Sequence, residues 1–249
     1  MIKAVIFDWA GTTIDYGCFA PVQALISGFK SVGIEISTEM VRKPMGLPKF
    51  DHIKAISTML DRPLSEKKII KVYKVFEKIL LNDIEKYCDL KDYVLDVVAE
   101  LKQNGIKIGS TTGYTSLMME KVLAKSMKQG YHPDFCIAPD QVERGRPHPD
   151  MILKNLKQFS IHNSREVVKV GDTIVDITEG KNAGCWTVGV IIGSSELGLS
   201  RDEFNKLTSN KLETKKNSVR KRYFRAKADF VIDDLNDLKK VLEDINKRV

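Results

Sequence analysis

Six short apolar runs recur along this 249-residue chain, and longer stretches with helical spacing separate them. Short apolar runs that alternate with helical segments are typical of parallel strands joined by right-handed crossovers. The pattern therefore predicts an α/β fold with a doubly wound, Rossmann-like parallel sheet. The expected strands are residues 2–7, 106–110, 135–138, 167–171, 186–190 and 230–232.

One interval breaks this rhythm. Nearly a hundred residues separate the first two expected strands, whereas a complete strand–helix–strand unit needs about 30. Apolar residues within the interval recur at helical spacing, as in residues 22–29 and 69–80. We therefore expect an α-helical cap over residues 17–95, inserted into a core formed by residues 1–16 and 96–249. Such a cap would lie over the carboxyl ends of the strands, where ligands bind in open α/β sheets.

Composition narrows the class of protein. No apolar run approaches the roughly 20 residues that span a bilayer, and strand pattern begins directly at the first residues, so no targeting segment is expected. The four cysteines are scattered without a Cys-x-x-Cys pair, which favours reduced thiols over disulfides or a zinc site. These features predict a soluble, cytoplasmic protein.

Most of the net charge of +7 comes from one segment, since residues 206–227 contain nine lysines or arginines and one acid, Glu213. We interpret this segment as a solvated helix whose inward face consists of Leu212, Val219, Tyr223 and Ala226. Binding to nucleic acid or to an anionic membrane is the alternative. No nucleic-acid motif accompanies the charge, so we expect neither partner.

The first expected strand ends at Asp8, which a Gly-Thr turn follows at residues 11–12. This arrangement suits a carboxylate that is held out of the core as a nucleophile and metal ligand. Many sites of this kind carry a second aspartate two positions later, but Ala10 stands there. The missing second aspartate narrows the range of possible reactions more than any residue that is present.

Three more segments follow later strands and should reach the same edge of the sheet. Thr112 and Gly113 offer a hydroxyl and exposed backbone N–H groups, which suit phosphate oxygens as well as a helix cap. Arg146 could clamp a phosphate, although a lone arginine is more often a surface residue. Asp172 and Asp176, four residues apart at a strand end, could hold Mg²⁺ through oxygen ligands.

The order of Asp8, Thr112, Arg146 and the Asp172/Asp176 pair resembles the four motifs of the haloacid dehalogenase superfamily. Within that superfamily the chain is similar to the phosphonatase family. The matching stretches are residues 7–17, 42–49, 109–115, 145–147 and 193–198. Ala10 together with Lys49 makes this second resemblance specific.

The resemblance implies hydrolysis of phosphonoacetaldehyde to acetaldehyde and phosphate, with Mg²⁺ as cofactor and a homodimer joined through the caps. It implies that Asp8 is the nucleophile and a metal ligand, that the Ala10 carbonyl and Asp172 are further metal ligands, and that Asp176 supports them. The remaining positions carried over are the Schiff-base lysine Lys49 with His52 beside it, and the substrate- and phosphate-binding residues Met45, Thr112, Gly113 and Arg146.

The residues near Lys49 support this chemistry independently. A carbon–phosphorus bond has no leaving oxygen to protonate, so an imine formed by lysine can accept the electrons and an acid at position 10 is dispensable. Pro48 is well placed as the first helical residue, which puts Lys49 in the first turn, where the helix dipole disfavours a cation. His52 falls on the same helix face and could transfer protons during imine formation.

Two other functions remain open. A phosphatase of the same superfamily would hydrolyse a small phosphate ester, and a carboxylate at position 10 would have favoured it. A binding protein on the same scaffold would use the basic segment to hold nucleic acid, although an intact Asp8 and Asp172 argue against a protein without catalysis.

Overall fold

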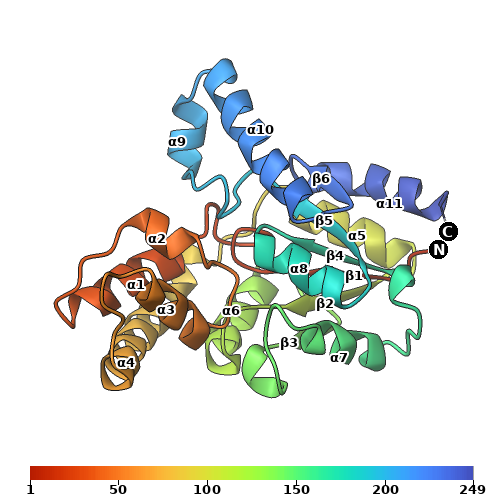
Figure 1. Cartoon of the computed structure of the whole chain (residues 1–249). Helices are drawn as coiled ribbons and strands as arrows, with labels where there is room; N and C mark the ends of the chain where they lie inside the picture. The colour runs from red at the N-terminus through yellow and green to blue at the C-terminus, as the bar shows by residue number, and fades with distance from the viewer. Residues whose placement is uncertain (249) are drawn as a thin grey trace.

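The computed structural model describes residues 1–248 and contains one six-stranded parallel sheet (Figure 1). Its spatial order is β3-β2-β1-β4-β5-β6. The strands are β1 (Ala4–Phe7), β2 (Lys107–Thr111), β3 (Phe135–Ile137), β4 (Val167–Gly171), β5 (Trp186–Val190) and β6 (Phe230–Ile232). The predicted α/β fold with a doubly wound sheet is confirmed, and every expected run contains a strand whose ends differ by at most two residues.

Helices cover both faces of this sheet because successive side chains of each strand point in opposite directions. Val5 and Phe7 of β1 belong to the larger core, whereas Ala4 and Ile6 belong to a second one. The helices α5 (Val94–Gln103), α6 (Ser116–Lys128) and α11 (Leu238–Asn246) contribute to the larger core. The opposite face is covered by α7 (Asp150–Gln158), α8 (Ile174–Asn182) and α10 (Ser209–Arg225).

The strand order sets the position of the site. The chain proceeds outward from β1 to β2 and β3, then returns to β1's other side with β4. Phe7 pairs with Val170, so β1 and β4 end side by side. A crevice opens at such a switch point in doubly wound sheets, and side chains that follow the two strands meet there.

Between β1 and β2, the described chain contains helices and no strand. We call residues 17–95 the helical insertion. It contains α1 (Ala20–Lys30), α2 (Thr38–Arg42), α3 (Lys49–Thr58), α4 (Glu66–Asp83) and the 3₁₀ helix η1 (Ile84–Tyr87). These helices cluster beside the sheet, far from both termini (Figure 1). Phe29, Val72 and Phe76 are fully buried where α1 packs against α4, and α5 begins at Val94, one residue before the predicted end of the insertion.

Two connections join the insertion to the sheet, and they lie side by side through a bridge between Ile14 and Leu90. In the first connection, Asp15, Gly17 and Cys18 have φ values of 52°, 88° and 54°. The Asp15 carboxylate accepts hydrogen bonds from the backbone of Phe19 at 2.9 Å and of the following alanine at 3.0 Å. The start of α1 is thereby capped at the point where the chain turns away from the sheet.

The basic segment forms α9 (Arg201–Lys206) and α10, which project from the body of the protein in Figure 1. Val219 and Tyr223 of α10 are buried, as predicted for its inward face, whereas Leu212 and Ala226 are partly exposed. The outward cations are exposed: Lys206, Lys211, Lys215, Lys221, Arg225 and Lys227. The interpretation of this segment as a solvated helix is confirmed.

Two expectations from composition can also be compared with the structure. Among residues 1–248, no helix combines the length and apolar character needed to cross a membrane. All four cysteines are unpaired thiols, which confirms that the fold contains no disulfide framework.

Candidate active site

The first catalytic candidate, Asp8, leaves the carboxyl end of β1 in a tight turn. Its backbone N–H donates to the Val170 carbonyl at 2.9 Å, which extends the pairing with β4 by one residue. Gly11 lies within this turn at φ +89°, and a Cβ there would lie 2.1 Å from a carboxylate oxygen of Asp172. Only glycine therefore lets the turn after β1 approach the residue after β4 so closely.

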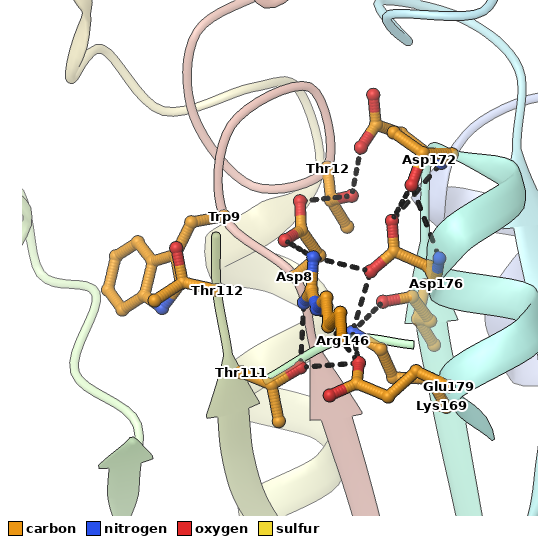
Figure 2. A network of polar contacts seen from close by, with 12 residues as sticks. Asp8, Trp9, Thr12, Thr111, Thr112, Arg146, Lys169, Asp172, Asp176 and Glu179 are labelled. Carbon is orange, nitrogen blue, oxygen red and sulfur yellow. Dashed lines mark hydrogen bonds and ion pairs between the residues drawn. The ribbon is translucent and has the colours of Figure 1, made fainter. Parts of the chain in front are cut away.

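Asp8, Asp172 and Asp176 form a buried cluster in which one carboxylate oxygen from each lies within 4.8 Å of the others. Figure 2 shows them converging from the ends of β1 and β4. The structure therefore brings together the three carboxylates that the sequence predicts to meet. Burial and the charge of Asp8 raise the pKa of Asp172 well above its ordinary value, and burial together with Asp176 raises that of Asp8.

Asp176 is fixed by its neighbours on all sides. One of its oxygens accepts from the Thr173 hydroxyl at 2.6 Å in a capping box at the start of α8. The other lies 3.0 Å from the Lys169 amine and 3.1 Å from the Arg146 guanidinium. Burial alone would raise the pKa of Asp176, but Arg146, Lys169 and the Thr173 hydroxyl together hold it below its ordinary value.

Arg146 precedes α7 and reaches the nucleophile candidate directly. Its guanidinium is 2.9 Å from Asp8, 2.9 Å from Glu179, and donates to the Thr111 hydroxyl at 2.7 Å. The residue is almost entirely buried. Although burial opposes the charge, Asp176, Glu179 and Asp8 raise the pKa of Arg146, so this side chain is a permanent cation beside Asp8.

Sequence reasoning missed several members of this network (Figure 2): Thr12, Thr111, Lys169 and Glu179. Lys169 is fully buried in the middle of β4. A lysine within an otherwise apolar central strand is itself a signal, because a buried charge requires a partner. Glu179 stands three residues after Asp176 on α8 and so shares its helix face, which could also have indicated it.

The donor set fits a divalent cation. Among residues 1–248, the carboxylates of Asp8, Asp176 and Glu179 share two cations, Arg146 and Lys169, whereas the buried carboxylate of Asp172 forms no ion pair. One oxygen of Asp8 and one of Asp172 each lie 3.3 Å from the Thr12 hydroxyl, which has a single proton to donate. Carboxylate oxygens that outnumber their proton donors match what a hard cation such as Mg²⁺ prefers.

Lys49 is the first residue of α3. Pro48 has the extended ψ of 140°, and its carbonyl accepts the first helical hydrogen bond, from His52 at 2.9 Å. The helix thus begins one residue later than predicted, since Pro48 takes the capping position, and Lys49 lies in the first turn as expected. Its amine sits 5.1 Å from the centre of the Tyr114 ring. Burial lowers the pKa of Lys49.

Lys49 and Asp8 line the same small cavity. Its volume of about 20 Å³ is enough for roughly one water molecule. The other residues that line it are Ala10, Cys18, Met45, Gly46, Thr112, Tyr114, Asp172 and Thr173. A much larger groove of about 760 Å³ lies between α5 and α11, near the amino ends of β1 and β2, and includes none of the predicted site residues.

Four predicted site residues lie outside the lining of this cavity: Gly113, Arg146, Asp176 and His52. A Cβ on Gly113 would lie 2.8 Å from the Leu47 carbonyl, so this glycine lets the helical insertion press against the sheet edge. Thr112 lines the cavity, and its hydroxyl accepts from the Tyr114 backbone at 3.0 Å.

His52 is fully buried behind Lys49. Its Nε2 lies 2.8 Å from the Val41 carbonyl, which only a protonated nitrogen can bond, and its Nδ1 has no partner in the described part of the chain. Burial and the nearby charge of Lys49 lower the pKa of His52 to about 3. The imidazole is therefore neutral, with its free lone pair on Nδ1.

Known hydrolase families match this chain over most of its length. The family of haloacid dehalogenase-like hydrolases matches residues 2–184, and a second hydrolase model of the same kind matches residues 143–238. A β-phosphoglucomutase structure from Clostridium difficile shares the fold at a TM-score of 0.74 and 19% identity, covering 100% of this chain and 99% of that one.

Three proteins with higher sequence identity to this chain are described as phosphonoacetaldehyde hydrolases or as similar to them. The phosphonoacetaldehyde hydrolase of Bacillus cereus is 45% identical, and that of Bacillus thuringiensis (strain Al Hakam) is 44% identical, with 99% of this chain and 97% of each relative covered. The structure of a phosphonoacetaldehyde hydrolase-like protein from Oleispira antarctica has a TM-score of 0.94 at 36% identity, covering 99% of this chain and 93% of that one. The chain therefore belongs to the haloacid dehalogenase-like hydrolases and, within them, to the family of phosphonoacetaldehyde hydrolases.

Proposed function

We propose that this protein hydrolyses the carbon–phosphorus bond of phosphonoacetaldehyde to acetaldehyde and phosphate. One observation carries the proposal: a buried lysine, Lys49, and a buried aspartate, Asp8, face the same small cavity, and Ala10 stands where a general acid would serve an ester. Cleavage of a carbon–phosphorus bond needs an electron sink on carbon and a nucleophile for phosphorus. These two side chains supply both.

Lys49 provides the electron sink. Its lowered pKa increases the fraction of neutral amine, which attacks the aldehyde carbon and releases water to form an imine. The neutral His52, with a free lone pair at Nδ1, is the proposed proton acceptor for this step. Met45 and Tyr114 line the cavity beside Lys49 and exclude bulk water, which keeps the amine desolvated.

Asp8 provides the nucleophile. One carboxylate oxygen attacks phosphorus while the electrons of the carbon–phosphorus bond move into the protonated imine and give an enamine. Water then hydrolyses the aspartyl phosphate to phosphate, and protonation and hydrolysis of the enamine release acetaldehyde and free Lys49. Arg146, fixed 2.9 Å from Asp8, neutralises charge on the phosphoryl oxygens, and the backbone at Thr112 and Gly113 binds them.

Mg²⁺ would be held by Asp8, Asp172 and the carbonyl of Ala10, and when bound it supplies charge neutralisation at the phosphoryl group. Asp176 is the supporting residue, since its oxygens are already taken by Thr173, Lys169 and Arg146. The contact between Asp8 and Arg146 leaves the second Asp8 oxygen for the cation.

We further propose that residues 17–95 act as a movable cap on a core of residues 1–16 and 96–249. The cavity has room for about one water, so the cap must move to admit a substrate. A cytoplasmic homodimer joined through the caps fits two exposed apolar residues, Met59 directly after α3 and Ile70 on α4, which could pack against a second copy.

The nearest alternative is a phosphatase for small phosphate esters. Such an enzyme would need an acid for the leaving oxygen, and Ala10 cannot supply one. Phosphate release from phosphonoacetaldehyde and from p-nitrophenyl phosphate, measured side by side, separates the two activities.

Borohydride trapping is the decisive experiment. Borohydride added during turnover should reduce the imine and leave a stable adduct on the Lys49 peptide, detected by mass spectrometry. Lys49→Arg should give no adduct and nearly no cleavage, whereas Lys54→Arg, on the exposed side of the same helix, should behave as wild type. If no lysine is labelled and Lys49→Arg still cleaves phosphonoacetaldehyde, the proposal is wrong.

A further inference from the structure

The loop after β5, residues 191–198, touches the metal-ligand candidate. The backbone N–H of Ser195 donates to one carboxylate oxygen of Asp172 at 2.7 Å. Internal bonds hold the loop in shape, from the Ser194 N–H to the Ile191 carbonyl at 3.1 Å and from the Gly198 N–H to the Ser194 carbonyl at 3.0 Å. Because a hydrogen bond to one oxygen fixes the direction of the other, the position of Ser195 sets how Asp172 presents its remaining oxygen.

The cap holds the same serine from the other side. Arg42, the last residue of α2, donates through one nitrogen to the Ser195 carbonyl at 3.1 Å and to its hydroxyl oxygen at 3.3 Å. The same nitrogen reaches the Gly17 carbonyl in the first connection at 2.8 Å. The guanidinium also lies over the Phe19 ring, 4.9 Å from its centre. One cap side chain therefore joins a connecting segment to the loop that orients Asp172.

This contact is suited to breaking and re-forming. The other two guanidinium nitrogens of Arg42 are buried and have no partner within residues 1–248, and unsatisfied donors weaken the closed arrangement. The cavity beside Asp8 holds about one water, so substrate entry requires the cap to move. Since Arg42 belongs to the cap and Ser195 to the core, such movement separates them.

We propose that Arg42 is a positioning residue that couples cap closure to the geometry of Asp172. In the closed state Arg42 holds Ser195, whose N–H then fixes the Asp172 carboxylate for a divalent cation. When the cap opens, Ser195 is released and the carboxylate loses this restraint. Linkage requires the reverse effect as well, so a bound cation favours the closed cap. The inference rests on the proposed role of Asp172 as a metal ligand.

Mn²⁺ binding tests this coupling without any substrate. Free Mn²⁺ is counted by electron paramagnetic resonance during titration of wild type, Arg42→Met and Lys43→Met. Loss of a residue that orients a metal ligand typically weakens binding about 10- to 100-fold, so Arg42→Met should show a loss of this size. Lys43→Met removes an exposed neighbour on the same turn, 3.6 Å from Glu39, and should bind as wild type.

A second measurement separates coupling from a merely structural role. In wild type, Mn²⁺ should slow hydrogen exchange in the connecting residues 15–19 and 88–91, and in Arg42→Met this protection should disappear. Should Arg42→Met fail to fold, Arg42→Lys keeps a cation with one donor centre and should lose affinity to a smaller extent.

The results that would contradict the coupling differ from the result that would contradict the proposed function. Mn²⁺ affinity and protection that stay at the wild-type level in Arg42→Met and Arg42→Lys overturn the coupling while leaving the proposed reaction intact. Wild-type protein that binds no Mn²⁺ overturns it as well. Wild-type protein that binds Mn²⁺ but does not cleave phosphonoacetaldehyde overturns the proposed function alone.

Discussion

The two sides of the cavity shift the pKa of a buried basic side chain in opposite directions. On the sheet side, Arg146 contacts three carboxylates, and these raise its pKa despite complete burial. On the cap side, Lys49 is equally buried, but among the described residues no carboxylate lies within ion-pair distance, and its pKa is lowered. Burial alone therefore does not decide the charge of a group, because partners decide it.

The difference matches the two chemical tasks. In the proposed reaction, Arg146 must remain charged to stabilise phosphoryl oxygens, whereas Lys49 must lose its proton to attack a carbonyl carbon. Placing the nucleophilic amine on a separate helical unit keeps it away from the carboxylates that would hold it protonated. The Tyr114 ring, rather than an anion, faces the amine.

The largest expected effect comes from removing the proposed nucleophile on the sheet side. Asp8→Asn should reduce turnover by about 10⁴-fold or more, because an amide does not attack phosphorus. Imine formation on the cap side should survive, so borohydride should still label Lys49 in this variant. Appreciable turnover of Asp8→Asn, with deamidation excluded by mass spectrometry, would contradict the assignment.

Removing the cation should also act on the sheet side alone. Excess EDTA should abolish phosphate release, and added Mg²⁺ should restore it, since the phosphoryl group otherwise lacks the charge neutralisation that the cation supplies. The Lys49 imine should still be trapped in EDTA if substrate is supplied at a higher concentration. Unchanged turnover after dialysis against EDTA would refute a metal requirement.

The stability of two matched lysine variants sharpens the comparison. Lys169→Met strips Asp176 and Glu179 of a buried cation and should cost about 3–5 kcal/mol of unfolding free energy. Lys49→Met replaces a buried lysine with no ion-pair partner and should be neutral or stabilising at pH 7. Urea denaturation of both variants measures the difference, and equal destabilisation would show that the two sides do not differ.

The pH dependence of stability gives a second test of the lowered pKa of Lys49. The folded-state pKa of Lys49 is below the 10.5 of an exposed lysine, so between these values the folded protein binds fewer protons than the unfolded chain. Wild-type stability therefore gains a contribution as pH rises through this interval, and this gain is absent below it. Lys49→Met should lose that pH-dependent gain, whereas Lys43→Met should keep it.

The smallest effect is expected from Tyr223→Phe. The fully buried Tyr223 hydroxyl lies 2.6 Å from the Asp172 carbonyl and 3.0 Å from the Val190 carbonyl, so α10 braces the residue after β4. Loss of this hydroxyl should lower stability by about 1 kcal/mol and weaken Mn²⁺ binding less than Arg42→Met does. Isothermal titration beside urea denaturation checks both; a larger effect on Mn²⁺ than that of Arg42→Met would reverse the ranking.

The strands and the carboxylates at their ends followed from the sequence for a simple reason. Central parallel strands read as continuous apolar runs, and Asp8 and Asp172 directly follow two of them, so their positions depend on local pattern and one topological rule. The predicted start of α3 was wrong by one residue, because Pro48 takes an extended ψ that the sequence alone does not specify.

The supporting residues depended on tertiary contacts instead. Lys169 interrupts an otherwise apolar strand, which signals a buried charge, but its partners Asp176 and Glu179 lie on α8 and are identified only by tertiary contact. Arg42 and Ser195 are 153 residues apart along the chain and meet only when the cap lies on the core. Both residues lie in stretches of sequence that match the family pattern. Only the contact between them, however, indicates a role for Arg42 or for Ser195.

The central position of β1 has a consequence for biosynthesis. This strand leaves the ribosome before either of its partners, and one of them, β4, follows about 160 residues later, since Ala4 pairs with Val167. At translation rates of 5–20 residues per second, that interval lasts about 8–30 s. Both edges of this apolar strand are unpaired until β2 is synthesised, and the edge that pairs with β4 stays unpaired to the end of the interval. For most of this time Asp8 also lacks Arg146, which contacts its carboxylate in the folded protein.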